Sequence, residues 1–121
     1  MNGYFSKKGE LFFEIDLIAA DRAVITIDAM LDTGFTDWLA MDIQEINSLG
    51  WTFIKEQRKQ TAGGEAKFEL YAGTVLLDGI NMTIPVLGGE EITHVLMGLQ
   101  WLETRRLVVD KKMSLLTLGV D

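Results

Sequence analysis

The sequence has 121 residues, which is enough to bury a substantial core in one domain and too few for two domains. Hydrophobic residues make up 48% of the chain, and this fraction excludes general disorder. The formal net charge of −7 argues against nucleic acid and anionic membranes as partners, because both require clustered lysine and arginine. We therefore expect residues 1–121 to form a single domain that binds neither of these partners.

Several kinds of reactive or targeting feature are missing from the sequence. It contains no cysteine, so cysteine nucleophiles and cysteine-ligated zinc are excluded. His94 is the single histidine, which excludes multi-histidine metal sites. Residues 1–8 lack the apolar segment of a signal peptide, and no apolar run approaches the roughly 20 residues needed to span a bilayer. A soluble, cytoplasmic protein is the expectation that follows.

The first elements in the chain form a hairpin that leads to an acid. Residues 11–18 alternate between apolar and acidic side chains from Phe13 onward, which predicts a half-buried strand. Residues 19–22 form the turn, and the returning strand from residue 23 ends at Asp32. A carboxylate at the end of a buried strand is costly to desolvate unless something uses or satisfies it. Asp32 is therefore a candidate functional residue.

A short helix is predicted after an extended piece at residues 35–40. Asp42 is a good N-cap, and Glu45 three residues later completes a pattern like the capping box. Gly50 is a suitable C-terminal stop. We expect a helix over residues 43–49 that covers the core and anchors the loop leading out of the acid site.

Residues 51–60 and 67–71 are expected to be strands joined by a glycine-containing tip. The tip, residues 61–65, contains two adjacent glycines that give it little conformational restraint. One interpretation is an ordinary surface hairpin, which is what most such turns are. The other is a mobile cover over a site. The residues themselves favour the first interpretation.

The second half of the chain repeats the order of the first. Residues 74–87 predict another hairpin, which turns at Asp78-Gly79, and an apolar run follows it. Hairpin, apolar run, glycine and short helix thus occur twice, once ending at Gly34 and once at Gly98. In this alignment Leu96-Met97-Gly98 matches Asp32-Thr33-Gly34, so only the first copy carries an acid.

The remaining features are expected to be structural. His94 is interpreted as a strand residue without a chemical role, and residues 88–91 as an exposed turn. Trp51 and Trp101 are expected in the core. Residues 107–118 predict a final hairpin whose apolar run fits either the core or an edge between subunits.

Three of these motifs together resemble those of retropepsin-like aspartic proteases, the small single-domain kind found in retroviruses, bacteria and archaea. They are the apolar strand that enters Asp32-Thr33-Gly34, the tip 62–64 at the position of the flap, and Leu96-Met97-Gly98 followed by a helix over residues 99–103. The resemblance spans residues 11–118. It implies an all-β fold, a small closed β-barrel with one or two short helices.

The resemblance also implies a function and a set of site residues. One chain of such a protein supplies one aspartate, here Asp32, and a homodimer brings two together. The two carboxyls share a proton and activate a water for hydrolysis of a polypeptide substrate, without metal or cofactor. The implied supporting residues are Thr33 and Gly34 in the active-site loop, Ala62, Gly63, Gly64 and Glu65 in the flap, and Phe35 and Gly98 in the cleft wall.

The chain departs from the family pattern at three positions. Phe35 stands where the family most often has alanine or serine, which implies a narrower and more apolar cleft. Thr36 and Leu99 stand where retroviral members have an aspartate and an arginine that pair with each other. Because both partners of that ion pair are missing together, no orphan charge is left.

Two functions therefore remain open. The first is a homodimeric aspartic endopeptidase. The second is a non-catalytic dimerisation or peptide-binding module that retains the fold, in which Asp32 is a turn aspartate that caps its own loop.

Overall fold

Most of the chain is β-strand, as its alternating patterns predict. The computed structural model describes residues 1–119, and within them it has ten strands, one α-helix and one 3₁₀-helix. In chain order these are β1 (Gly3–Phe5), β2 (Leu11–Ile18), β3 (Val24–Leu31), β4 (Leu39–Asp42), α1 (Ile43–Leu49), β5 (Thr52–Thr61), β6 (Gly64–Leu77), β7 (Ile80–Gly89), β8 (Val95–Met97), η1 (Leu99–Glu103), β9 (Arg106–Asp110) and β10 (Leu115–Gly119).

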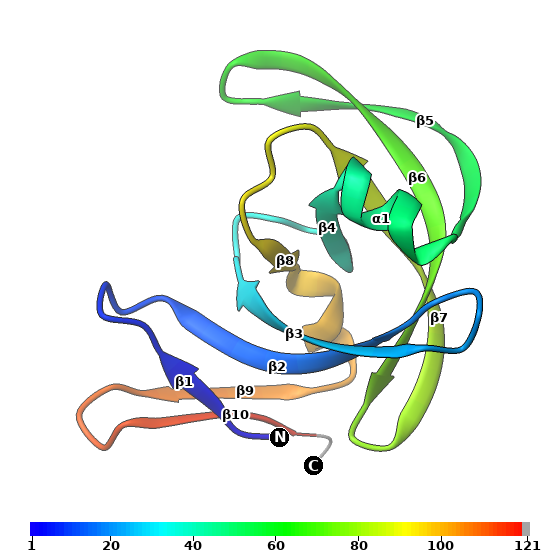
Figure 1. The fold of residues 1–121 in the computed structure, drawn as a ribbon. Helices are drawn as coiled ribbons and strands as arrows, with labels where there is room; N and C mark the ends of the chain where they lie inside the picture. Colours follow the sequence, from blue (N-terminus) through cyan, green and yellow to red (C-terminus); the bar gives the residue numbers. More distant parts are fainter. Residues whose placement is uncertain (120–121) are drawn as a thin grey trace.

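Six strands close into a barrel because β2 pairs with β3 on one side and with β6 on the other. The order around the barrel is β2-β3-β8-β4-β7-β6. Outside this closed set, β1 pairs with β2 and β5 pairs with β6. The sheet is mixed, since β3 pairs with β8 and β4 with β7 in parallel. Figure 1 shows β4 and β8 in the middle of the molecule, above the β2–β3 hairpin. The predicted small closed β-barrel is confirmed.

The barrel has an internal two-fold relation that corrects one sequence prediction. Leu39 pairs with Val86 in β7 and with Met97 in β8, while Leu96 pairs with Met30 in β3 and with Ala40 in β4. Strand β4 therefore corresponds to β8, and β7 to β3. The counterpart of the acid loop at the end of β3 is then the end of β7, around Gly88-Gly89. The predicted duplication exists, but its assignment of residues 96–98 as the second copy of the acid loop was wrong.

Helix α1 has the bounds that its sequence predicts. The Asp42 carboxylate accepts the backbone N–H of Gln44 at 3.1 Å, so it caps the helix through the second rather than the third helical residue. Gly50 ends the helix at φ 73°, in the left-handed region where glycine is unstrained.

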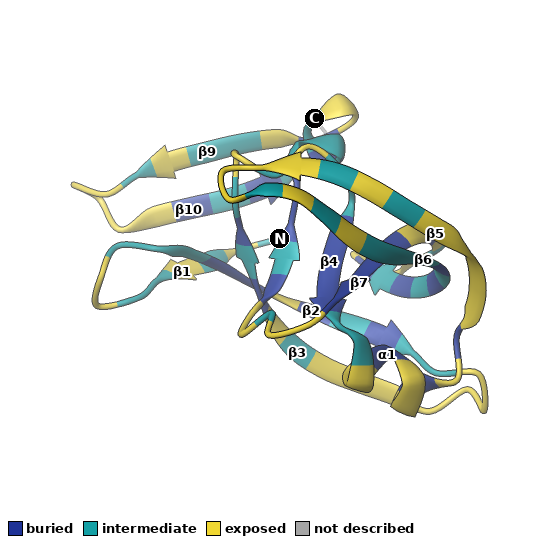
Figure 2. Cartoon of the chain, turned by 90° about the horizontal axis from the view of Figure 1, so that it is seen from above, coloured by how far each residue is buried: buried dark blue, intermediate teal, exposed yellow. Residues whose placement is uncertain are grey.

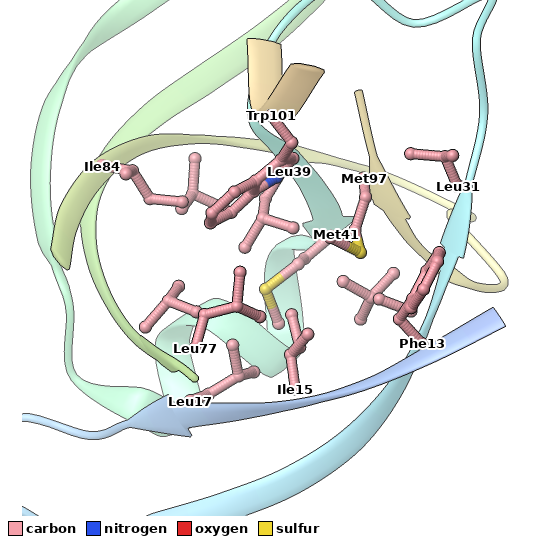
Figure 3. Close-up of a cluster of buried hydrophobic side chains, with 14 of the residues drawn as sticks. Phe13, Ile15, Leu17, Leu31, Leu39, Met41, Leu77, Ile84, Met97 and Trp101 are labelled. Atoms are coloured by element: carbon pink, nitrogen blue, oxygen red, sulfur yellow. The ribbon is translucent and has the colours of Figure 1, made fainter. Parts of the chain in front are cut away.

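The core fills the barrel interior with apolar side chains from most of the strands, from α1 and from η1, whereas β5 contributes none (Figure 3). Trp101 is completely buried and Trp51 is 8% exposed, which confirms both as core residues. His94 is exposed and lies in a bend just before β8, so its assignment to a strand was wrong. Within residues 1–119, no helix has the length and apolar character required to cross a membrane.

The final hairpin is confirmed, and it forms a separate two-stranded sheet of β9 and β10. Its apolar run alternates, because Leu116 and Leu118 are buried in the core while Leu115 is exposed. The chain's first residues lie against it, since Asn2 bridges to Thr117. Figure 2 shows that exposed residues gather at the hairpin tips and along β5 and the start of β3.

Candidate active site

Asp32 lies where strand β3 leaves the barrel. Leu31 is buried, and the N–H of Asp32 still pairs with the carbonyl oxygen of Met97 in β8 at 2.9 Å. The chain then turns, and the Asp32 carboxylate oxygen Oδ1 accepts the N–H of Gly34 at 2.9 Å. A Cβ on residue 34 would lie 3.2 Å from this oxygen, so glycine gives the backbone room to approach. Asp32 is half-buried and Thr33 is exposed, which leaves both open to a second molecule.

Residues 35–38, which follow the acid, are held by the start of helix η1. The carbonyl oxygen of Phe35 accepts the N–H of Leu99 at 2.8 Å. The carbonyl oxygen of Trp38 accepts both the N–H of Gly98 at 3.0 Å and the indole Nε1–H of Trp101 at 2.8 Å. These bonds fix the loop through its backbone, so its support does not depend on an ion pair at residues 36 and 99.

Gly98 is packed against the loop that follows Asp32. A Cβ at this position would lie 2.0 Å from the carbonyl oxygen of Asp37 and 2.8 Å from that of Phe35. No side chain fits at such distances, so the sequence requires glycine here for close backbone contact. Gly98 therefore supports the active-site loop from behind and contributes no side chain to a cleft wall.

The predicted flap is the β5–β6 hairpin, called the flap hairpin below. Its strands pair from Thr52↔Ala72 to Thr61↔Gly64, and its turn residues Ala62 and Gly63 are exposed. The Thr61 hydroxyl donates to the carbonyl oxygen of Gly64 at 2.7 Å and closes the turn. The tip is thus a tight two-residue turn rather than a longer loose loop.

A cavity of about 760 Å³ lies between the active-site loop and the flap hairpin. Of the predicted site residues, Gly34 and Phe35 line it from the loop, and Ala62 lines it from the flap. The structure brings these three together across the cavity. Asp32, Thr33, Gly63, Gly64, Glu65 and Gly98 do not line it in the single chain.

Most of the cavity lining was not predicted from the sequence. Its further residues are Thr36, Ala40, Lys59, Gln60, Thr61, Phe68, Leu87, Ile92 and Leu96. Residues 88–91 were predicted to be an exposed turn, but Gly88 and Gly89 are buried at the end of β7, so the prediction was wrong for both. Ile92 follows this segment, and aligning the end of β7 with the acid loop would have marked the residues after it as part of the site.

The charged groups around the cavity include an ion pair that joins the flap hairpin to the loop. The Lys59 ammonium lies 2.5 Å from the Asp37 carboxylate oxygen Oδ2. Within residues 1–119 this buried oxygen has no hydrogen bond of good geometry, so Lys59 balances its charge as an ion-pair partner. No group of three histidine, aspartate or glutamate side chains in these residues is placed to hold a metal ion.

Solved structures share this architecture. A retropepsin-like aspartic protease from Rickettsia conorii is 22% identical, with a TM-score of 0.70, over 98% of this chain and 89% of that one. The protease of EIAV, in complex with the inhibitor HBY-793, is 18% identical with a TM-score of 0.59, over 81% and 93% of the two chains. The simian foamy virus (mac) protease is 17% identical with a TM-score of 0.51, over 78% and 100%. The chain has the retropepsin-like fold.

The predicted family resemblance is confirmed at the level of this fold. Searches with family models and among curated proteins found no match. The solved structures that share the fold are only 17% to 22% identical to this chain, so these matches rest on tertiary structure. The match to the Rickettsia protein includes nearly the whole chain, so both the barrel and the final hairpin belong to the shared architecture.

Proposed function

We propose that the protein is an aspartic endopeptidase that acts as a homodimer, with one catalytic Asp32 from each chain. The observation that carries this proposal is the position of Asp32, at the end of a barrel strand in a loop that lines a cavity beneath a hairpin. A single carboxylate does not supply both the acid and the base of peptide hydrolysis. A symmetric dimer supplies the second carboxylate from an identical loop.

In this mechanism the two Asp32 carboxyls face each other across the two-fold axis. They share one proton, because two like charges so close together cannot both ionise. The ionised carboxyl takes a proton from a bound water as that water attacks the peptide carbonyl carbon. The protonated carboxyl donates its proton to the carbonyl oxygen. The N–H of Gly34 holds one oxygen of Asp32 in place, and Thr33, which is exposed, links the two loops.

The position of the flap hairpin is an argument that the substrate is a polypeptide. Its tip, Ala62 to Glu65, would close over an extended peptide that lies in the cavity. Phe35, Phe68 and Leu87 make much of the cavity wall apolar, so we expect it to accept apolar side chains of the substrate. The EIAV protease, whose fold this chain shares, was solved in complex with an inhibitor.

The first test is cleavage of an unfolded polypeptide by purified protein at mildly acid pH. Asp32→Asn removes the ionisable group and should lower the rate by at least about a thousandfold. The matched control is Asp28→Asn, an exposed aspartate on the same strand. Statine-type mimics of the tetrahedral intermediate should inhibit the wild type. Cleavage that survives Asp32→Asn unchanged would show that Asp32 is not catalytic.

The second candidate is a peptide-binding module without catalysis. The bond between the Asp32 carboxylate and the Gly34 N–H favours it, because a turn aspartate that only caps its loop makes the same bond. Such a module would bind unfolded peptides with the same affinity before and after Asp32→Asn and would cleave none. Fluorescence anisotropy of a labelled peptide, measured beside the cleavage assay, separates the two functions.

A further inference from the structure

Strand β5 of the flap hairpin is an edge strand. It pairs only with β6, and it ends the order of the eight-stranded sheet. No backbone ladder therefore holds β5 to the rest of the barrel, and the exposed turn of the tip adds no support. A Cβ built on Gly63 or Gly64 would meet nothing within 4 Å. Apart from its ladder with β6, the position of β5 above the loop that follows Asp32 depends on its side chains.

One side chain of β5 reaches the loop that follows Asp32. Lys59 lies three residues before the first turn residue, Ala62, and is half-buried, whereas its neighbours Arg58 and Gln60 are exposed. Its ammonium contacts the carboxylate of Asp37 at 2.5 Å. Asp37 is itself fixed by the backbone of η1, because its carbonyl oxygen accepts the N–H of Gln100 at 3.4 Å. The ion pair thus joins the edge strand β5 to a loop whose backbone is held by η1.

This pair differs from the other ion pairs of the flap hairpin in residues 1–119. Arg58–Glu65 and Lys67–Glu56 connect β5 and β6 to each other, and their side chains are all more than half exposed. The Lys59 and Asp37 side chains are 26% and 38% exposed, and the Asp37 oxygen that faces the ammonium is buried. Solvent screens such a pair less than a surface pair, so it has more effect on the position of β5.

The pair also lies where two cavities adjoin. Lys59 lines the cavity of about 760 Å³, and Asp37 lines a neighbouring cavity of about 150 Å³. Leu87 lines both of them. The contact between Lys59 and Asp37 therefore lies on the boundary between the two cavities.

We propose that Lys59 is a positioning residue for the peptide cleft. Its ion pair with Asp37 holds strand β5 down on the active-site loop and sets the height of the closed flap above a bound peptide. This inference rests on the proposed peptidase function for its effect on substrate, while its effect on the flap is independent of any activity. Loss of either charge should leave β5 held by β6 alone.

The test uses Lys59→Met, Asp37→Asn and the double variant. The measurements are hydrogen–deuterium exchange of residues 57–63 in the free protein, and KM and kcat for peptide cleavage. Each single variant should exchange faster in this segment and raise KM by about threefold to fivefold, with a smaller change in kcat. The double variant should be no worse than either single one, because each removes the same contact.

Two controls separate positioning from general damage. Lys67→Met removes an exposed ion pair within the hairpin and should change neither exchange in residues 57–63 nor KM. Lys59→Arg keeps the positive charge and should retain most of the slow exchange. Wild-type exchange in Lys59→Met would overturn the inference, and so would faster exchange with an unchanged KM. If the proposed peptidase function is wrong, the wild-type protein will cleave no peptide. In that case the hydrogen–deuterium exchange of Lys59→Met and wild type still decides whether the ion pair holds the flap hairpin.

Discussion

Gly98 allows close backbone packing against residues 35–37, in the loop that follows Asp32. Its N–H donates to the carbonyl oxygen of Trp38, and the space for a Cβ is occupied by the backbone at Asp37 and Phe35. Because backbone atoms rather than flexible side chains fill this space, the loop would have to move to admit a methyl group.

We predict that Gly98→Ala lowers the free energy of unfolding by about 2 kcal/mol or more, since overpacking a close contact costs this much. The measurement is urea unfolding monitored by tryptophan fluorescence. Gly63→Ala is the matched control, because a Cβ there meets nothing and the residue is not in the left-handed region. If the two variants are equally stable, the close contact at residue 98 is not as tight as described.

The contribution of Tyr71 to the stability of the fold depends on pH. Its hydroxyl donates to Glu69 Oε2 at 2.5 Å, and this bond, together with burial, raises the pKa of Tyr71 to about 12. The pKa in the folded chain lies above the ordinary value of 10.0, so folding favours the protonated phenol. The stability it contributes is complete below pH 10 and is lost as pH rises toward 12.

The corresponding prediction compares wild type with Tyr71→Phe in urea unfolding from pH 8 to pH 12. Wild-type stability should decline more steeply above pH 10, because only the wild type must lose the phenol proton. Parallel curves for the two proteins would show that Tyr71 does not titrate in this way.

At the scale of elements, one carboxylate, that of Asp78, joins three parts of the chain. Arg105, between η1 and β9, is 4% exposed in its side chain, and its Nη1 lies 2.9 Å from Asp78 Oδ2 in the β6–β7 turn. The Met1 ammonium lies 3.7 Å from the same carboxylate oxygen and donates to the carbonyl oxygen of Leu118 at 2.9 Å. Asp78 thus balances two positive groups.

We predict that Asp78→Asn destabilises the fold by about 3 kcal/mol, because it leaves a buried guanidinium without a counter-charge. Asparagine tolerates the φ of 50° at this position, so the turn itself is preserved. Asp21→Asn, in the exposed turn before β3, is the control and should change stability by less than about 0.5 kcal/mol. Thermal unfolding at neutral pH measures both, and equal melting temperatures would contradict the assignment.

The whole molecule determines whether the proposed site is complete. Each chain has one Asp32, so activity by the proposed mechanism requires pairing of two chains. Specific activity should therefore rise with protein concentration near the dimer dissociation constant. Sedimentation velocity over the same concentrations should show dimer formation in parallel.

A mixing experiment tests the shared site directly. Adding an equal amount of Asp32→Asn protein to wild type, followed by exchange of subunits, should lower cleavage to about half, because random pairing places wild-type chains in mixed dimers. Asp28→Asn protein, added in the same way, should raise cleavage, because its chains contribute their own Asp32. A wild-type rate that is unaffected by the Asp32→Asn chain would mean that one chain works alone.

The sequence by itself determined the elements and the type of fold. Alternation over residues 11–18 predicted β2, and the cap at Asp42 with the glycine at residue 50 predicted α1 with its observed bounds. These signals are local, because side-chain periodicity and capping act within a few residues. The motif at Asp32, the glycine tip at residues 62–64 and the glycine at residue 98 then resembled those of retropepsin-like proteases, and that resemblance implied the barrel.

Only the tertiary structure decided which residues meet. Leu87, Ile92 and Lys59 line one cavity although they lie in separate segments, and no local signal links them. The correspondence of the acid loop with the end of β7 rather than with residues 96–98 likewise depends on strand pairing across the barrel. Pairing register and side-chain contacts across a cleft are set by long-range packing, which a single sequence does not specify residue by residue.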